Sequence, residues 1–116
     1  MAEVTKEIQD KAYEAVELAK KTGKIKKGTN EVTKAVERGN AKLVVVSGNV
    51  NPKEIVMHIE PLCREKDIPC VVVSSKEDLG AAAGLPVGTS SVAIIKEGDS
   101  LNVIKEIKVG LNKKNG

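Results

Sequence analysis

The chain has 116 residues, with 41% apolar and 30% charged residues, which is typical of one soluble globular domain spanning residues 1–116. No apolar run reaches the roughly 18 residues of a membrane span, and the first ten residues lack a signal-peptide pattern, so a cytoplasmic protein is expected. The net charge of +3 is unevenly distributed, because residues 20–42 carry eight cations and two acids while the rest carries eleven cations and fourteen acids. This local excess favours a polyanionic partner, although a solvated basic surface is an equally good interpretation.

The first part of the chain predicts two helices and two strands. In residues 3–21, apolar side chains recur at three- and four-residue spacings, which indicates an amphipathic helix that ends at Gly23. Residues 24–28, "KIKKG", predict a short edge strand, and residues 30–38 predict a helix that ends at Gly39. The unbroken apolar run in residues 41–46, "AKLVVV", predicts a strand that is buried on both faces.

The middle of the chain predicts a helix that starts at Asn51 and Pro52, with Asn51 as the N-cap and Pro52 in the first position. Pro61 lies within this helix and is expected to kink or shorten it. His58 lies beside the apolar stripe, so we expect it to be packed or half exposed. The stripe consists of Ile55, Val56, Ile59, Leu62 and Cys63.

The last part predicts two more strands, "IPCVVVSS" and "VAIIK", and two more helices. Ser75 is expected to cap a short helix, with Asp78 as its capping-box partner. The second helix is expected over residues 101–109, followed by a frayed tail, "LNKKNG". This alternation of helices and strands predicts an α/β fold, namely a three-layer α/β/α sandwich with a small mixed sheet.

Motifs of the common enzyme classes are missing. Gly80, Gly84 and Gly88 are spaced four apart, which does not match a dinucleotide-binding loop, and no phosphate-binding loop occurs. Cys63 and Cys70 do not form a Cys-x-x-Cys pair, and one histidine cannot complete a zinc site, so we expect structural thiols rather than a metal site or a disulfide. These observations predict a protein that is not an enzyme, with no catalytic residue, metal or cofactor.

The start of the helix at residues 30–38 is the best candidate for a binding site. At 100° per residue, one compact arc carries an amide, a carboxylate, an ammonium and a guanidinium, from Asn30, Glu31, Lys34 and Arg38. Backbone N–H groups at a helix start favour a phosphate, and Gly28 lets a ligand approach the backbone closely. Amide, carboxylate and ammonium groups match the edges of purine bases. The alternative is an ordinary exposed helix with a Glu31–Lys34 surface pair.

The chain has one Tyr and no Phe or Trp, so it lacks the aromatic platform on which many RNA-binding folds stack bases. A nucleic acid would have to be bound through hydrogen bonds, charge and aliphatic contacts. Tyr13 alone cannot supply a stacking surface.

Four segments carry a resemblance to a known family: "KGTNEVTKAVERG", "AKLVVV", "LCREKDIPCVVVSSKEDLG" and "AAGLPV". Together they closely resemble the L7Ae family of archaeal ribosomal proteins, within the kink-turn RNA-binding superfamily, from about residue 13 to residue 98. The resemblance implies an α/β/α sandwich that binds the kink-turn, a sharply bent RNA loop with tandem G·A pairs. It also implies roles in ribosomal RNA, in box C/D and H/ACA guide RNA particles, and in ribonuclease P with its tRNA processing.

The resemblance assigns roles to individual residues. It places Asn30, Glu31 and Lys34 against the guanines of the G·A pairs. The segment just before Asn30 would supply backbone contacts to the RNA. The cations that follow Lys34 in the sequence would bind phosphates. An aliphatic loop would cover a flipped-out nucleotide. The remaining implied RNA-binding residues are Lys27, Gly28 and Thr29 before the helix, Arg38 and Lys42 as phosphate contacts, Lys76 near the RNA, and Leu85, Pro86 and Val87 in the loop.

This chain departs from the family pattern at three places. Relatives often have an acidic residue where this loop has Pro86, and an acidic segment where this chain has residues 47–52, "SGNVNP". Cys70 occupies a position that is often aromatic. Two alternatives remain for function: a protein-interaction domain of the same fold without specific RNA recognition, and the recognition half of an RNA-modifying enzyme, for which no catalytic segment is evident in the sequence.

Overall fold

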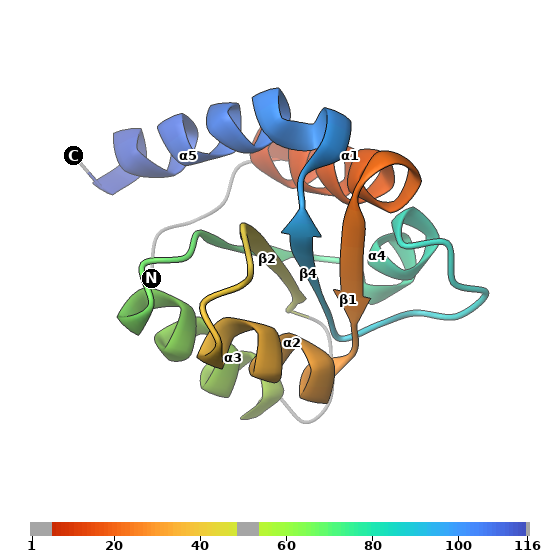
Figure 1. Ribbon diagram of the computed structural model, residues 1–116, viewed down its shortest axis with the longest axis horizontal. Helices are drawn as coiled ribbons and strands as arrows, with labels where there is room; N and C mark the ends of the chain where they lie inside the picture. Colours follow the sequence, from red (N-terminus) through yellow and green to blue (C-terminus); the bar gives the residue numbers. More distant parts are fainter. Residues whose placement is uncertain (1–5, 49–53, 116) are drawn as a thin grey trace.

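The computed structural model describes residues 6–48 and 54–115, and it confirms the predicted mixed α/β fold with helices on both faces of a four-stranded sheet (Figure 1). Within the described residues, no helix is both long and apolar enough to cross a membrane. The elements, in chain order, are α1 (Lys6–Thr22), β1 (Lys24–Lys27), α2 (Thr29–Glu37), β2 (Leu43–Ser47), α3 (Glu54–Glu65), β3 (Cys70–Val73), α4 (Lys76–Ala82), β4 (Ser91–Lys96), the 3-10 turn η1 (Gly98–Ser100) and α5 (Leu101–Asn115).

The sheet has the strand order β1-β4-β2-β3. Strand β4 pairs in antiparallel fashion with β1 and with β2, whereas β2 and β3 are parallel. Every residue of β2 is buried, as its unbroken apolar run predicts, because this strand lies inside the sheet and is covered on both faces. The polar "KIKK" strand lies at the edge, also as predicted.

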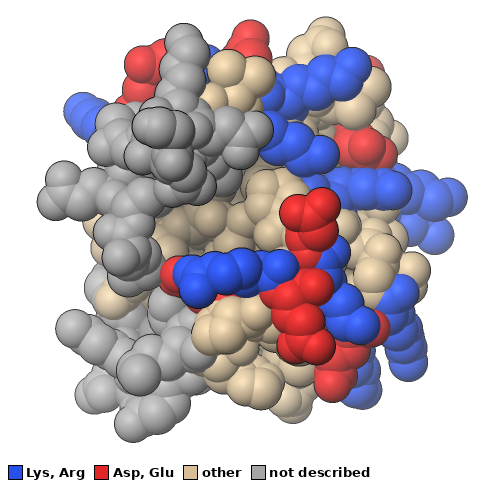
Figure 2. All heavy atoms as spheres, turned by 90° about the vertical axis from the view of Figure 1, so that its left-hand side faces the viewer, with Lys and Arg blue, Asp and Glu red and all other residues tan. Residues whose placement is uncertain are grey.

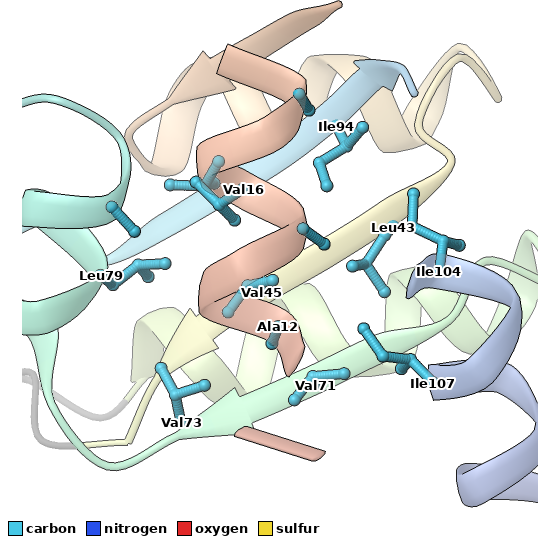
Figure 3. Packing of buried hydrophobic residues seen from close by; sticks show 14 of the residues in the cluster. Ala12, Val16, Leu43, Val45, Val71, Val73, Leu79, Ile94, Ile104 and Ile107 are labelled. Atoms are coloured by element: carbon cyan, nitrogen blue, oxygen red, sulfur yellow. The ribbon is translucent and has the colours of Figure 1, made fainter. Parts of the chain in front are cut away.

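Two apolar cores lie on opposite faces of the sheet, and β2 contributes alternate residues to each. Leu43 and Val45 face the larger core beneath α1, α4 and α5, which Figure 3 shows from close by. Val44 and Val46 face the smaller core beneath α2 and α3. The larger core also contains Ala12, Val16, Val71, Leu79, Ile94 and Ile107, and the smaller one Val32, Val36, Ile59 and Ala93.

The cysteines are free thiols, as expected, and both belong to the smaller core. Cys63 on α3 is fully buried, and the half-buried Cys70 at the start of β3 packs against the same cluster. Burial of this kind is ordinary for a thiol, which behaves as a small apolar side chain.

Two expectations about the helices were wrong. The tail expected to fray continues α5 to Asn115, because its lysines and asparagines do not break a helix that is already anchored through Ile104 and Ile107. His58 was expected to be packed or half exposed, but it is exposed, since the stripe of α3 that includes Ile59 points away from it. The predicted start at residues 51 and 52 lies outside the described residues. Pro61 lies within α3 and does not end it.

Candidate nucleic-acid interface

Helix α2 starts without a side-chain cap. Gly28 occupies the N-cap position with φ 93°, a backbone conformation that favours glycine, and no side chain accepts a hydrogen bond from the first turn. A side chain added at Gly28 would meet nothing within 4 Å, so the space in front of the helix start is open. The free N–H groups of the first turn and the positive end of the helix dipole make this opening suitable for an anionic group.

The start of α2 is tied to the start of β4. The Gly28 amide donates to the Ser91 carbonyl oxygen at 3.0 Å, and the Thr29 and Ser90 hydroxyls lie 2.8 Å apart in a hydrogen bond. The Thr29 side chain is half-buried, and its hydroxyl is engaged in the hydrogen bond with Ser90. The Thr29 side chain thus helps to hold the helix in place. The Gly28 amide is engaged by Ser91 and the Gly28 carbonyl oxygen accepts from the Val32 amide, so the backbone donors left for a ligand start at the Thr29 amide, and the implied contact with Gly28 is limited to close approach of the ligand.

One face of α2 is exposed and polar, as the helical arc predicts. Val32, Ala35 and Val36 are buried, whereas Asn30, Glu31, Lys34 and Arg38 are exposed. The alternative Glu31–Lys34 surface pair is not formed, because no nitrogen–oxygen contact within 4.0 Å joins them. Both side chains are therefore free, within the described part of the chain, to contact a ligand.

The cations of residues 20–42 form no ion pair with any described residue. All three ion pairs found among the described residues lie elsewhere: Lys11 contacts Glu7 and Glu106, and Arg64 contacts Glu60. Figure 2 shows a different side of the molecule, the left-hand side of Figure 1, where acidic and basic side chains are interleaved. The basic segment around α2 thus has positive charge that the described part of the protein does not neutralise by pairing.

A loop of residues 83–90 brings α4 to the start of α2, although the two are about 50 residues apart in sequence. The Thr89 amide donates to the Lys76 carbonyl oxygen at 3.1 Å, and the next residue, Ser90, is the one that bonds Thr29. The end of β2 also contacts this loop, because the Ser47 hydroxyl donates a hydrogen bond to the Thr89 carbonyl oxygen at 2.9 Å. These contacts gather Lys76, the loop and the start of α2 on one side of the molecule.

Helix α4 is itself held from two directions. The Ser75 hydroxyl accepts from the Asp78 amide at 3.1 Å, which confirms the predicted cap. From the other side, the Tyr13 hydroxyl of α1 donates to the Ser75 carbonyl oxygen at 3.4 Å, and burial raises the pKa of this hydroxyl. The single aromatic residue thus helps to position Lys76.

The three aliphatic loop residues differ in exposure. Val87 is 68% exposed and Pro86 is also exposed, whereas Leu85 is half-buried and packs against the larger core. Leu85 and Val87 were expected to serve alike as ligand contacts, but they are not equivalent. Part of the Leu85 side chain is engaged in the fold, whereas the Val87 side chain is accessible. Gly80 packs closely against this loop, since a side chain on Gly80 would overlap the backbone of Val87.

Of the three remaining predicted residues, one adjoins the start of α2 and two lie further away. Lys27 ends β1 and directly precedes Gly28. Arg38 follows the last turn of α2, roughly 13 Å from Thr29 at the 1.5 Å rise of a helix. Lys42 precedes β2 at the end opposite Ser47, about 16 Å away along the strand. The structure therefore separates a compact group around the start of α2 from two outlying cations, Arg38 and Lys42.

Sequence reasoning missed the residues that assemble this group. Ser47, Thr89 and Ser90 link β2, α4 and α2, yet they are small hydroxyl residues that match no binding motif. The only signal is their position at the end of β2 or within two residues before β4. Among the described residues, no group of three or more His, Cys, Asp or Glu side chains could hold a metal ion.

The layers, the mixed sheet and the open helix start define an α/β/α sandwich with a basic, ligand-accessible edge. Residues 10–104 match the model of the Ribosomal protein L7Ae/L30e/S12e/Gadd45 family, and the chain belongs to that family. Among solved structures it is similar to the Giardia lamblia 15.5kD RNA binding protein. The two share 33% sequence identity and superpose with a TM-score of 0.85, over 97% of this chain and 91% of the other.

Proposed function

We propose that this chain is an RNA-binding protein, without enzymatic activity, that recognises kink-turn motifs. The observation that carries the proposal is the group formed by the uncapped start of α2, the exposed Asn30, Glu31 and Lys34, and the exposed Val87 loop. Family membership and the likeness to an RNA-binding protein support it. The proposed partners are ribosomal RNA, box C/D and H/ACA guide RNAs and ribonuclease P RNA, with the other proteins of those particles. A cytoplasmic location and an archaeal origin are part of the same proposal.

In the proposed mode of binding, each group has a chemical task. Glu31 accepts hydrogen bonds from guanine N–H groups, Asn30 both donates and accepts, and Lys34 donates to guanine acceptors. The amides at the open start of α2 and the lysines around them bind phosphates. The aliphatic loop covers an unstacked nucleotide, which suits a chain that has one aromatic residue.

A gel-shift titration tests the proposal. The chain is mixed with an RNA that contains a kink-turn, and with the same RNA in which the G·A pairs are replaced by Watson–Crick pairs. We expect clearly tighter binding to the first RNA at every salt concentration. Equal binding to both would contradict kink-turn recognition and would indicate a generic basic surface. Binding to neither would favour a protein-interaction domain of the same fold.

Replacing Lys34 and Arg38 by alanine is expected to give two different results. Lys34, which touches a base in this mode, should lose about 1–3 kcal/mol on the kink-turn RNA and much less on the control RNA. Arg38 lies at the far end of α2 and is proposed to contact phosphate, so its loss should weaken binding to both RNAs and lower the salt slope by about one unit. Titrations of both variants at several salt concentrations measure this. Identical losses on the two RNAs for both variants would contradict the assignment.

Serine substitutions in the loop separate ligand contact from core packing. Val87→Ser should weaken kink-turn binding by about 1 kcal/mol and leave the melting temperature unchanged, because the side chain is 68% exposed. Leu85→Ser should lower the melting temperature by several degrees, because this side chain packs against the larger core. Thermal unfolding and the same gel shift supply both readings. A Val87→Ser variant with unchanged affinity would exclude the loop from the interface.

A further inference from the structure

Lys20, in the last turn of α1, lies against the loop that follows α4. Its side chain covers Gly84, so that a side chain added at Gly84 would overlap the outer atoms of Lys20. Gly84 has φ 78°, which favours glycine, and its bare backbone leaves the space that the lysine occupies. The contact joins α1 to the first residues of the loop.

Lys20 has no hydrogen bond and no ion pair with any described residue, and it is exposed. Lys11, also on α1, lies between two carboxylates, whose hydrogen bond and charge raise its pKa. Lys20 therefore places a positive charge at the edge of the loop that the described part of the protein does not offset by pairing.

The loop has two ends, and both reach groups that attract an anion. Its last residues bond the start of α2, where the helix amides are open. Near its other end, Gly84 lies beneath Lys20. Figure 1 shows the loop extending outward from α4 and returning to the start of β4. A strand that covers the exposed Val87 can thus meet an anion-attracting group on either side, at the start of α2 or at Lys20.

We propose that Lys20 binds an RNA phosphate on the side of the loop away from α2, so that the RNA backbone is held on both sides of the aliphatic loop. The ligand is a polyanionic strand, since one unpaired ammonium next to an apolar contact suits a phosphate whose nucleotide lies on Val87. The inference rests on the proposed function, and it extends the interface to α1, which carries none of the residues assigned above.

Three variants test the inference, each titrated with the kink-turn RNA and with its G·A-replaced control. Lys20→Gln removes the charge, Lys20→Arg keeps it, and Lys6→Gln removes a matched exposed charge at the other end of α1. We expect Lys20→Gln to bind kink-turn RNA roughly five- to eight-fold more weakly at 0.1 M salt, with a salt slope reduced by about 0.7–0.9. Lys20→Arg and Lys6→Gln should bind like the unmodified chain.

The outcomes distinguish this inference from the proposed function. Equal affinities and slopes for Lys20→Gln and Lys6→Gln would overturn the role of Lys20 while leaving kink-turn recognition intact. A loss specific to Lys20→Gln, in a chain that does not prefer the kink-turn RNA, would support the phosphate contact and overturn kink-turn recognition. An unmodified chain that binds neither RNA would overturn both.

Discussion

Glu31→Ala is expected to weaken binding to a kink-turn RNA by about 1–3 kcal/mol, which is roughly a 5- to 150-fold loss of affinity. This direction is opposite to the one that charge alone predicts. Glu31 is an exposed carboxylate on the basic face of α2, with no ion pair to a described residue, so it repels an approaching phosphate backbone. The loss follows only if the carboxylate accepts hydrogen bonds from guanine N–H groups, because its removal leaves those donors without a partner at the interface.

A matched control on the same helix is available. Glu37 is also exposed, lies at the other end of α2 and falls outside the polar arc, so Glu37→Ala removes the same charge without touching the proposed contact. We expect Glu37→Ala to bind slightly more tightly, most clearly at low salt, where screening is weak. Tighter binding by both variants would show that α2 acts through charge alone and would end the base-recognition hypothesis.

The stability of the Glu31 variant has to be measured alongside its affinity. An acidic side chain in the first turn interacts favourably with the helix dipole, by about 0.3–1 kcal/mol. Glu31→Ala should therefore lower the melting temperature by a few degrees at most. Titration well below this melting temperature separates a lost RNA contact from a frayed helix start.

Gly80→Ala is expected to have the second large effect, on both stability and binding. Gly80 is buried in α4, and an added methyl group would overlap the Val87 carbonyl oxygen and lie 2.9 Å from the Gly88 Cα atom. Both neighbours are backbone, so the loop has to move away from the helix. Overpacking of this kind costs roughly 1–3 kcal/mol, or about 4 °C of melting temperature for each kcal/mol.

The displaced loop should also weaken kink-turn binding, because Val87 and the Thr89 contact to Lys76 move with it. Ala81→Ser provides the control, since it adds one atom at the neighbouring position of α4, where the side chain is exposed. That variant should match the unmodified chain in both measurements. A Gly80→Ala variant with unchanged melting temperature and unchanged affinity would show that the loop does not depend on close approach to α4.

Local patterns predicted most of the secondary structure. The apolar spacing on α1, the unbroken run on β2 and the cap at Ser75 are properties of neighbouring residues, and each was confirmed. For most of the described helices and strands, the observed boundaries differ from the predicted ones by one or two residues, since end residues have weak conformational preferences. The C-terminal tail was the clearest local error, because polar composition alone does not end a helix.

The face of α2 was also predictable from sequence, because helical geometry alone places Asn30, Glu31 and Lys34 opposite the buried valines. The role of these residues in RNA recognition stays a prediction. Residues 49–53, where the family pattern differs from this chain, lie outside the described residues, and any effect of that difference also stays a prediction.

The sequence by itself determined the layers of this protein, because the period of its apolar residues dictates which faces of its helices and strands are buried. It also determined the polar face of α2. Only the tertiary structure decided which segments meet that face. The hydrogen bonds of Ser47, Thr89 and Ser90 bring α4 and its loop to the start of α2, and the bare backbone of Gly84 admits Lys20. Such contacts depend on the path of the chain between distant residues, and hydroxyl groups and glycines carry no local signal of their eventual partners.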